Sequence, residues 1–229
     1  GASTGAGTAS APSTTASTGG SREPIPEETA GPYPGDGSNG PNALDDAGVV
    51  RSDIRTSVDI GSATAQGVAL TIAMAIVTTS GEPVDGAAVY VWHCDRDGNY
   101  SLYAAGLENE NYLRGVQAAG ADGKVTFRSV FPGCYAGRWP HVHFEVYASL
   151  DDAVGSGPIV ATSQIALPKA ECDAVYATDG YARSAANLAG ISLATDNVFG
   201  DDGAVHQLAT VTGDASAGYT AALTVPVAR

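Results

Sequence analysis

The sequence is poor in aromatic residues and in basic residues. Only 7 % of its 229 residues are Phe, Trp or Tyr while 44 % are hydrophobic, so a core must be built largely from small and β-branched side chains. Lys and Arg number 11 against 25 Asp and Glu, which gives a formal net charge of −14. A surface this acidic repels phosphate backbones and anionic lipid, so we expect no nucleic acid or membrane partner. No apolar run reaches the length of a membrane span.

Cysteine is also scarce, and its spacing excludes the common structural zinc sites. Cys94, Cys134 and Cys172 form no CxxC pair, on which those sites are built. In an exported protein, two of the three could form a disulfide and leave the third buried. We favour pairing of Cys134 with Cys172, a connectivity that the spacing alone does not fix.

The first residues lack every side chain that could build a core. Residues 1–21 contain only Gly, Ala, Ser, Thr and one Pro, and we interpret 1–23 as a flexible linker. Linkers of this composition often follow a secretory signal or a lipid anchor, so we expect a secreted or cell-surface protein. The alternative, a cloning remnant, fits a shorter tag better. Residues 24–229 would then form one domain.

From residue 24 onward, short β-branched runs alternate with turn residues. The pair Asp122-Gly123 precedes one run and is a strong hairpin signal. The fairly even spacing predicts an all-β fold, an antiparallel β-sandwich with long active-site loops and one short helical segment over 170–190. We expect 95–122 to be mostly loop, and loops of that length tend to be functional. The expected strands are 67–79, 87–94, 123–131, 141–150, 158–167, 204–213 and 219–227.

Two histidines one residue apart form the first candidate site. On a strand, His141 and His143 project from the same face about 6 to 7 Å apart at the backbone, so both imidazoles can converge on one ion. Alone the pair is a weak signal, because histidine also occurs on half-buried strands. Glu145 shares that face but lies about 13 Å from His141 on a straight strand, which argues against it as a third ligand.

Two tyrosines are better partners for these histidines. Tyr135 follows the bend at Pro132-Gly133 just before the histidine strand, and Tyr100 closes the segment DRDGNY after an earlier strand. Phenolate is a hard, charged oxygen donor that suits Fe(III), whereas zinc and copper sites favour imidazole with thiolate or carboxylate. Each tyrosine taken singly is also an ordinary strand or turn residue. The combination indicates a ferric site, with a zinc or copper site on the histidine pair as the alternative.

In this order the motifs resemble the intradiol ring-cleavage dioxygenases, non-haem ferric enzymes that open catechols between their two hydroxyls. The pattern is a GxY after one strand, a PGxY, an Arg three residues before HxH, and then a Gln. The segments that carry it are TAGPYP (29–34), VWHCDRDGNYS (91–101), YLRGVQAAGADGKVTFRSVFPGCY (112–135), GRWPHVHFEV (137–146) and TSQIAL (162–167). The resemblance is closest to the secreted branch, although GPYP stands where the family has GPYY.

The resemblance implies four iron ligands, namely Tyr100, Tyr135, His141 and His143. Tyr135 would be displaced by the substrate and then serve as a base, while Arg138 and Gln164 match the family's active-site arginine and glutamine. A guanidinium beside the metal can stabilise negative charge that develops on substrate oxygen. The implied reaction consumes O2 and a small aromatic diol and gives a cis,cis-muconate-type product, with iron as Lewis acid.

The main alternative is a transthyretin-like β-sandwich that binds or scaffolds within an exported protein and catalyses nothing. Within the enzyme interpretation, catechol, protocatechuate, hydroxyquinol and larger plant-derived phenols all stay open as substrates. Loop residues 101–122 would distinguish among them, and the oligomeric state is equally open.

Overall fold

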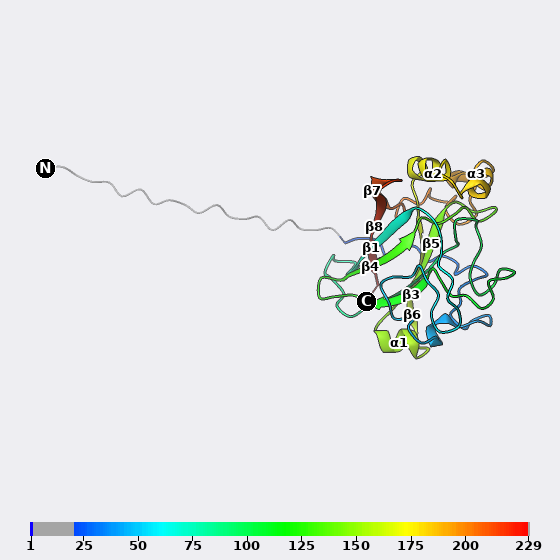
Figure 1. The fold of residues 1–229 in the computed structure, drawn as a ribbon. Coiled ribbons are helices and arrows are strands. Elements are labelled where there is room, and N and C mark those ends of the chain that lie inside the picture. Colours follow the sequence, from blue (N-terminus) through cyan, green and yellow to red (C-terminus); the bar gives the residue numbers. More distant parts are fainter. Residues whose placement is uncertain (2–20, 229) are drawn as a thin grey trace.

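The computed structural model describes Gly1 and residues 21–228. Most of the linker predicted over 1–23 lies outside the described residues, so the linker and the domain boundary stay predictions. The described part is mostly β-structure, with two four-stranded sheets and few, short helices (Figure 1). Within it, no helix is both long enough and apolar enough to cross a membrane.

The first sheet has the strand order β4-β1-β8-β7 and the second the order β3-β2-β5-β6. The first contains β1 (Ala69–Thr78), β4 (Lys124–Val130), β7 (Thr210–Asp214) and β8 (Gly218–Val227). The second contains β2 (Ala88–Trp92), β3 (Arg114–Ala118), β5 (His141–Tyr147) and β6 (Ile159–Ala166).

Two features of the sheets differ from the sequence-based expectation. The pair β1 and β8 is parallel, with Leu70 opposite Tyr219, so a wholly antiparallel arrangement was wrong. These strands are far apart in the sequence, so no tight turn between them forces them to be antiparallel. The other difference is β3, which lies inside the segment 95–122 that we expected to be mostly loop.

The helices also differ from the single helical segment predicted over 170–190. That stretch contains α2 (Lys169–Tyr176) and α3 (Ala182–Leu188), which are separated by a turn with Gly180 at φ +92°. A third helix, α1 (Leu150–Val154), begins with Ser149 as its N-cap, where we expected the β5 strand to continue. Short 3-10 helices occur at Ala43–Asp45 and Leu193–Thr195.

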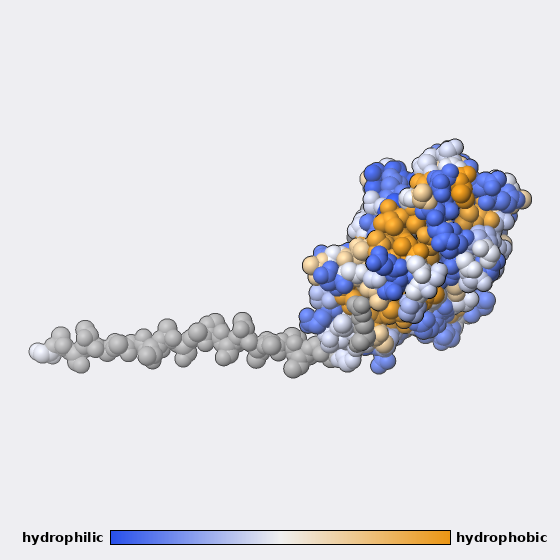
Figure 2. All heavy atoms as spheres, turned by 90° about the horizontal axis from the view of Figure 1, so that it is seen from below, coloured by the Kyte–Doolittle hydropathy of each residue, from blue (hydrophilic) through white to orange (hydrophobic). Residues whose placement is uncertain are grey.

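The main hydrophobic core joins the two sheets. It includes Ile72 and Phe127 from the first sheet and Val91 and Phe144 from the second, all fully buried. Hydrophobic side chains also gather between polar ones on the face of the molecule in Figure 2. Every residue of β5 is buried, because its second face is covered as well. That second face carries the histidine pair.

The cysteines are a further correction. All three are buried and free, so the favoured disulfide between Cys134 and Cys172 was wrong. The Cys134 thiol donates to the Arg138 carbonyl at 3.3 Å, while Cys172 packs from α2 into the main core. Burial raises the pKa of both thiols.

Candidate metal centre

The two histidines of β5 point their Nε2 atoms at each other. These nitrogens are 3.0 Å apart, and both side chains are almost wholly buried. His141 Nδ1 lies 2.6 Å from the Trp139 carbonyl, which only an N–H can satisfy, so its Nε2 carries the free lone pair. Burial, together with neighbouring cationic groups, lowers the pKa of His141 to about 3 and that of His143 well below its ordinary value. Both imidazoles are therefore neutral, as metal binding requires.

Tyr100 brings an oxygen to the same point. It follows β2 in the chain, and its hydroxyl lies 3.3 Å from His141 Nε2. Burial raises the pKa of Tyr100 well above its ordinary value, while Arg138 and Arg114 act in the opposite direction. The phenol therefore ionises only where a nearby cation stabilises the phenolate.

Tyr135 lies beside Tyr100 and is less buried. The two rings meet edge-on with centroids 5.7 Å apart. The Tyr135 hydroxyl is 3.2 Å from the hydroxyl of Tyr33, which comes from the N-terminal arm. That hydrogen bond and burial raise the pKa of Tyr135. Tyr33 thus belongs to the site, although we noted only its motif in the sequence.

His143 is enclosed from two further sides. The Trp92 indole stacks on its imidazole, and a Cβ on Gly31 would come within 3.3 Å of its Cε1 atom. Gly31 has φ +70°, so both its backbone conformation and the available space favour glycine. The buried His143 Nδ1 has no hydrogen-bond partner among the described residues.

Arg138 and Gln164 meet at the edge of this cluster. Arg138 Nη2 donates to Gln164 Oε1 at 2.7 Å, and Gln164 Nε2 donates to the Thr29 carbonyl at 2.9 Å. Arg138 Nε donates to Asp196 at 2.9 Å. Burial opposes ionisation of Asp196, yet hydrogen bonds from Arg138 and from backbone N–H groups hold its pKa below the ordinary value. The guanidinium is therefore fixed from two directions.

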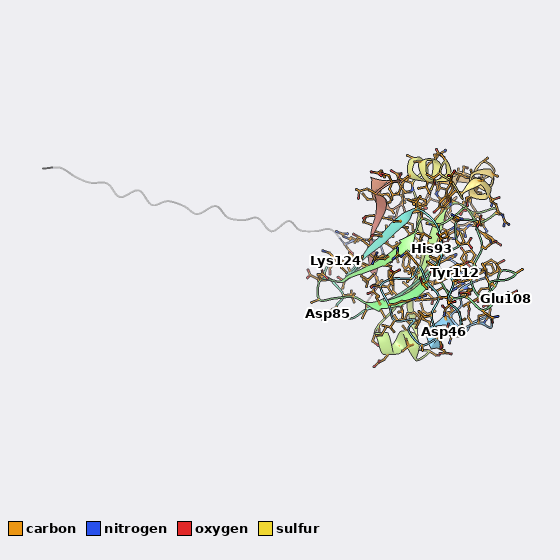
Figure 3. The ribbon with its side chains drawn as sticks, viewed as in Figure 1. Asp46, Asp85, His93, Glu108, Tyr112 and Lys124 are labelled. Carbon is orange, nitrogen blue, oxygen red and sulfur yellow. The ribbon has the colours of Figure 1, made fainter. Side chains whose placement is uncertain are left out.

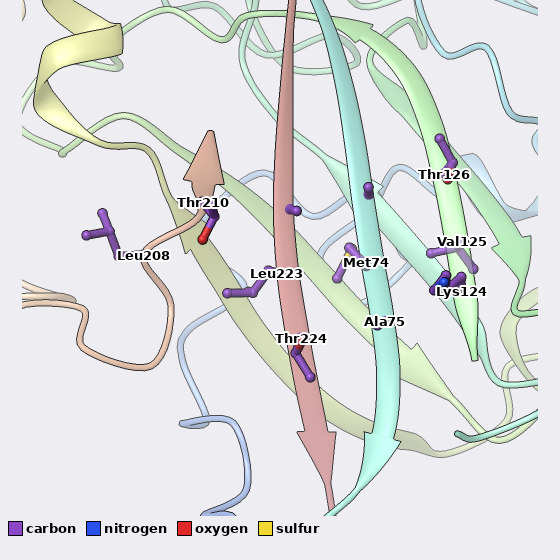
Figure 4. Close-up of a pocket in the computed structure, with 11 residues that line it drawn as sticks. Met74, Ala75, Lys124, Val125, Thr126, Leu208, Thr210, Leu223 and Thr224 are labelled. Atoms are coloured by element: carbon purple, nitrogen blue, oxygen red, sulfur yellow. The ribbon is translucent and has the colours of Figure 1, made fainter. Parts of the chain in front are cut away.

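These side chains open onto a cavity of about 500 Å³. Its lining includes Tyr33, Tyr100, Tyr135, Arg138, His141 and His143. A second cavity, of about 310 Å³, lies along β1, β4 and β8 and is lined mainly by small and apolar side chains such as Ala73, Met74 and Leu223 (Figure 4). None of the predicted site residues lines that second cavity, so the chemistry belongs to the first.

The donor set determines which ion the site suits. In the part of the chain that the structure describes, no group of three or more His, Cys, Asp and Glu side chains could hold a metal. The hydroxyl of Tyr100, 3.3 Å from His141 Nε2, is the further donor beside the histidine pair, and Tyr135 lies next to it. Two neutral imidazoles with two phenols suit a hard, strongly acidic cation such as Fe(III), and two donors 3.0 Å apart can bind one ion at bonds of about 2 Å.

Comparison with known proteins identifies the family of this chain. A family model described as "Dioxygenase" matches residues 39–154, half of the chain. Catechol 1,2-dioxygenase 1 of Acinetobacter lwoffii is 33 % identical over 125 residues, which cover 46 % of this chain and 37 % of that protein. The chain belongs to the intradiol ring-cleavage dioxygenase family.

Other members of the intradiol family are similar over different lengths. Chlorocatechol 1,2-dioxygenase of Rhodococcus opacus is 42 % identical over 57 residues, or 25 % of this chain and 22 % of that one. The matched segments thus span well under half of these two curated relatives. The solved intradiol ring-cleavage dioxygenase from Tetranychus urticae shares the fold, with a TM-score of 0.70 at 22 % identity over 90 % of this chain and 95 % of that one.

In this intradiol family member, five of the six predicted site residues line one cavity, and the sixth, Gln164, reaches it through Arg138. Glu145 is buried and accepts from Tyr147, away from the donor cluster, as distance along the strand predicted. Sequence reasoning missed Asp196. An arginine in a buried site requires a counterion, but no motif indicates which of 25 acidic residues supplies it.

Proposed function

We propose that this protein is a non-haem ferric dioxygenase that cleaves catechol-type rings between the two hydroxyls with O2, giving cis,cis-muconate-type products. The observation that carries the proposal is the convergence of Tyr100, His141 and His143 within 3.0–3.3 Å, beside Tyr135 and Arg138 in one cavity. The two sheets would form a β-sandwich that carries the site at its covered second face. The composition of residues 1–21 supports export to the cell surface or medium.

Four residues would hold the ion, namely Tyr100, Tyr135, His141 and His143. Bound Fe(III) would supply Lewis acidity, binding the catechol as its dianion and making the ring reactive toward O2. Both histidines are neutral, and the hydrogen bond from His141 Nδ1 to the Trp139 carbonyl leaves the lone pair of His141 Nε2 free to bind.

Tyr135 is the residue best arranged to accept a substrate proton. It is less buried than Tyr100, so its side chain has room to move when a diol enters the cavity. The hydrogen bond with Tyr33 and burial both favour the neutral phenol, so the raised pKa of Tyr135 makes its phenolate a stronger base. Proton transfer from a substrate hydroxyl to Tyr135 Oη then frees the substrate oxygen to bind.

Arg138 would stabilise negative charge on the reacting substrate oxygens. Its guanidinium lines the cavity and is held by Asp196 and Gln164, so it needs no reorganisation during the reaction. Gln164 is itself fixed to the Thr29 carbonyl, which ties the N-terminal arm to the arginine.

The test combines a visible spectrum with oxygen uptake. Protein loaded with Fe(III) should show a phenolate-to-iron absorption band and consume one O2 per catechol. Tyr100→Phe should weaken or remove the band. A colourless protein after iron loading, or stoichiometric zinc without iron, would contradict the proposal. Binding of catechol without oxygen uptake would favour the non-catalytic module instead.

A further inference from the structure

The lining of the candidate cavity is almost free of charge. Apart from the tyrosines and histidines of the donor cluster, it consists of uncharged side chains and Arg138. The uncharged residues are Thr29, Gly31, Pro32, Ala136, Gly137, Asn197 and Val198. Among the described lining residues, Arg138 is therefore the one permanent cation that could meet an anionic substrate group.

The Arg138 guanidinium is already paired with a carboxylate. The Asp196 carboxylate holds Arg138 Nε at 2.9 Å, and the side chain of Asp196 is 0 % exposed while that of Arg138 is 12 % exposed. The guanidinium also lies over the Phe199 ring, 5.7 Å from its centroid. Asp196 offsets much of the Arg138 charge at the distance of a ring substituent, although the guanidinium N–H groups can still donate to oxygens in direct contact with them. A carboxylate on the ring of a substrate would find no unpaired cation in the lining.

Further acidic residues lie beside this ion pair. Glu28 precedes the lining residue Thr29 and accepts from Gln207 at 2.9 Å. Burial raises the pKa of Glu28, and the charges of Asp201 and Asp202 raise it further while Arg138 lowers it. We refer to Glu28, Asp201 and Asp202 as the acidic rim. The rim adds local negative potential to a chain whose net charge is −14.

We propose, resting on the proposed ring-cleavage function, that the site takes catechols whose ring substituents are uncharged or cationic and discriminates against carboxylated catechols. The cavity has room for a substituent, since its volume is about 500 Å³. An anionic substituent would lose hydration and gain no unpaired cation among the lining residues, and the negative charge of the acidic rim would disfavour it further. Repulsion from one negative charge near the cavity should raise the dissociation constant of a carboxylated catechol by about tenfold or more relative to an uncharged one.

Three probes of similar size separate the charge classes. They are 4-methylcatechol, 3,4-dihydroxybenzoate and 3,4-dihydroxybenzylamine, each titrated without oxygen into the Fe(III)-loaded protein while the visible band is followed. We expect the dissociation constant of the benzoate to exceed that of 4-methylcatechol by about tenfold or more at low ionic strength. The benzylamine should bind at least as tightly as 4-methylcatechol. Added salt should reduce the difference.

Matched variants locate the effect. Asp201→Asn/Asp202→Asn removes two charges from the acidic rim, while Asp85→Asn/Asp122→Asn removes two charges from exposed turns that no part of the site uses. The rim variant should reduce the benzoate discrimination by about threefold, and the control variant should leave it nearly unchanged. Equal effects of the two variants would overturn the role of the rim.

The outcomes for substrate charge and for catalysis are separable. If the benzoate binds as tightly as 4-methylcatechol, the charge inference is wrong, whether or not oxygen is consumed. If 4-methylcatechol binds preferentially but an air-saturated sample shows no oxygen uptake, the proposed function fails and the charge inference stands. Failure of all three probes to bind would contradict both.

Discussion

The indole of Trp92 and the imidazole of His143 stack with their ring planes 1° apart and their centroids 4.9 Å apart. The two residues are direct neighbours across the β2–β5 pairing. His143 Nδ1 has no partner among the described residues, so this stack helps to fix the ring orientation, as a hydrogen bond does for histidines in metal sites.

Replacement of Trp92 should therefore weaken metal binding. Trp92→Leu removes the stacking surface, and we expect a loss of about tenfold in affinity for Fe(III) together with about 3 kcal/mol of stability. Trp92→Phe keeps a flat ring and should retain most of the affinity. Competition with a chelator measures the affinity and urea unfolding the stability. Equal affinities of the Leu and Phe variants would contradict the orienting role.

Gly31 gives a second test of how tightly His143 is enclosed. A Cβ at this position would meet His143 Cε1 at 3.3 Å, and φ is +70°. Gly31→Ala should therefore cost about 1–2 kcal/mol of backbone strain and also displace the imidazole.

Gly106 is the matched control, with φ +82° and no atom within 4 Å of an added Cβ. Gly106→Ala should show a similar strain cost in urea unfolding but leave iron affinity unchanged. If Gly31→Ala and Gly106→Ala bind iron equally well, the contact between Gly31 and His143 has no functional consequence.

Three of the four proposed donors, Tyr135, His141 and His143, lie within one short segment, so the sequence alone predicts that they lie close together. His141 and His143 share a face by the period-two alternation of any strand, and Tyr135 precedes them by a short bend. The residues that support these donors depend instead on how distant strands pair. Trp92 reaches His143 only through the β2–β5 register, which no local pattern specifies.

Local sequence patterns also do not specify the tertiary contacts behind the other errors of the sequence-based prediction. Asp196 lies 58 positions from Arg138, and only the tertiary fold brings the two together. The parallel pairing of β1 with β8 likewise joins segments with no connecting turn. The predicted disulfide between Cys134 and Cys172 was wrong because the spacing of cysteines in the sequence does not determine which thiols meet in the folded interior.

Arg114 connects the N-terminal arm to the loop that carries Tyr100. Arg114 is 1 % exposed, and its guanidinium donates to the carbonyls of Tyr33 at 3.0 Å, Pro34 at 2.8 Å and Ser101 at 2.9 Å. The donors sit on two separate nitrogens of the planar guanidinium, whereas the three N–H groups of a lysine share one nitrogen and cannot take up the same arrangement.

Arg114→Met should destabilise the fold by more than about 3 kcal/mol, because several buried carbonyls lose their donor. Arg114→Lys should recover only part of this loss. Arg128→Met is the control, since Arg128 is largely exposed and only 3.7 Å from Asp53, and it should cost less than about 1 kcal/mol. Urea unfolding gives all three values. A cost for Arg114→Met as small as that of Arg128→Met would contradict the connecting role.

His93 predicts how stability depends on pH. It lies in the interior (Figure 3), and its Nδ1 donates to the Cys94 carbonyl while Ser129 donates to its Nε2, both at 2.7 Å. Burial lowers the pKa of His93 from 6.5 to about 4. Between these values the unfolded chain binds a proton that the folded protein does not, so stability falls as pH drops from 6.5 towards 4.

Between pH 6.5 and pH 4, His93 should lower the free energy of unfolding by about 3 kcal/mol. The His93→Gln variant should not show this part of the decrease. His141 and His143 are also buried and neutral, but they are present in both proteins, so the difference between the two pH profiles isolates His93. Urea unfolding of the metal-free proteins at intervals from pH 7 to pH 4 measures it. We expect the wild-type profile to be steeper. Parallel profiles would show that His93 is protonated in the folded protein or that its burial is relieved on acidification.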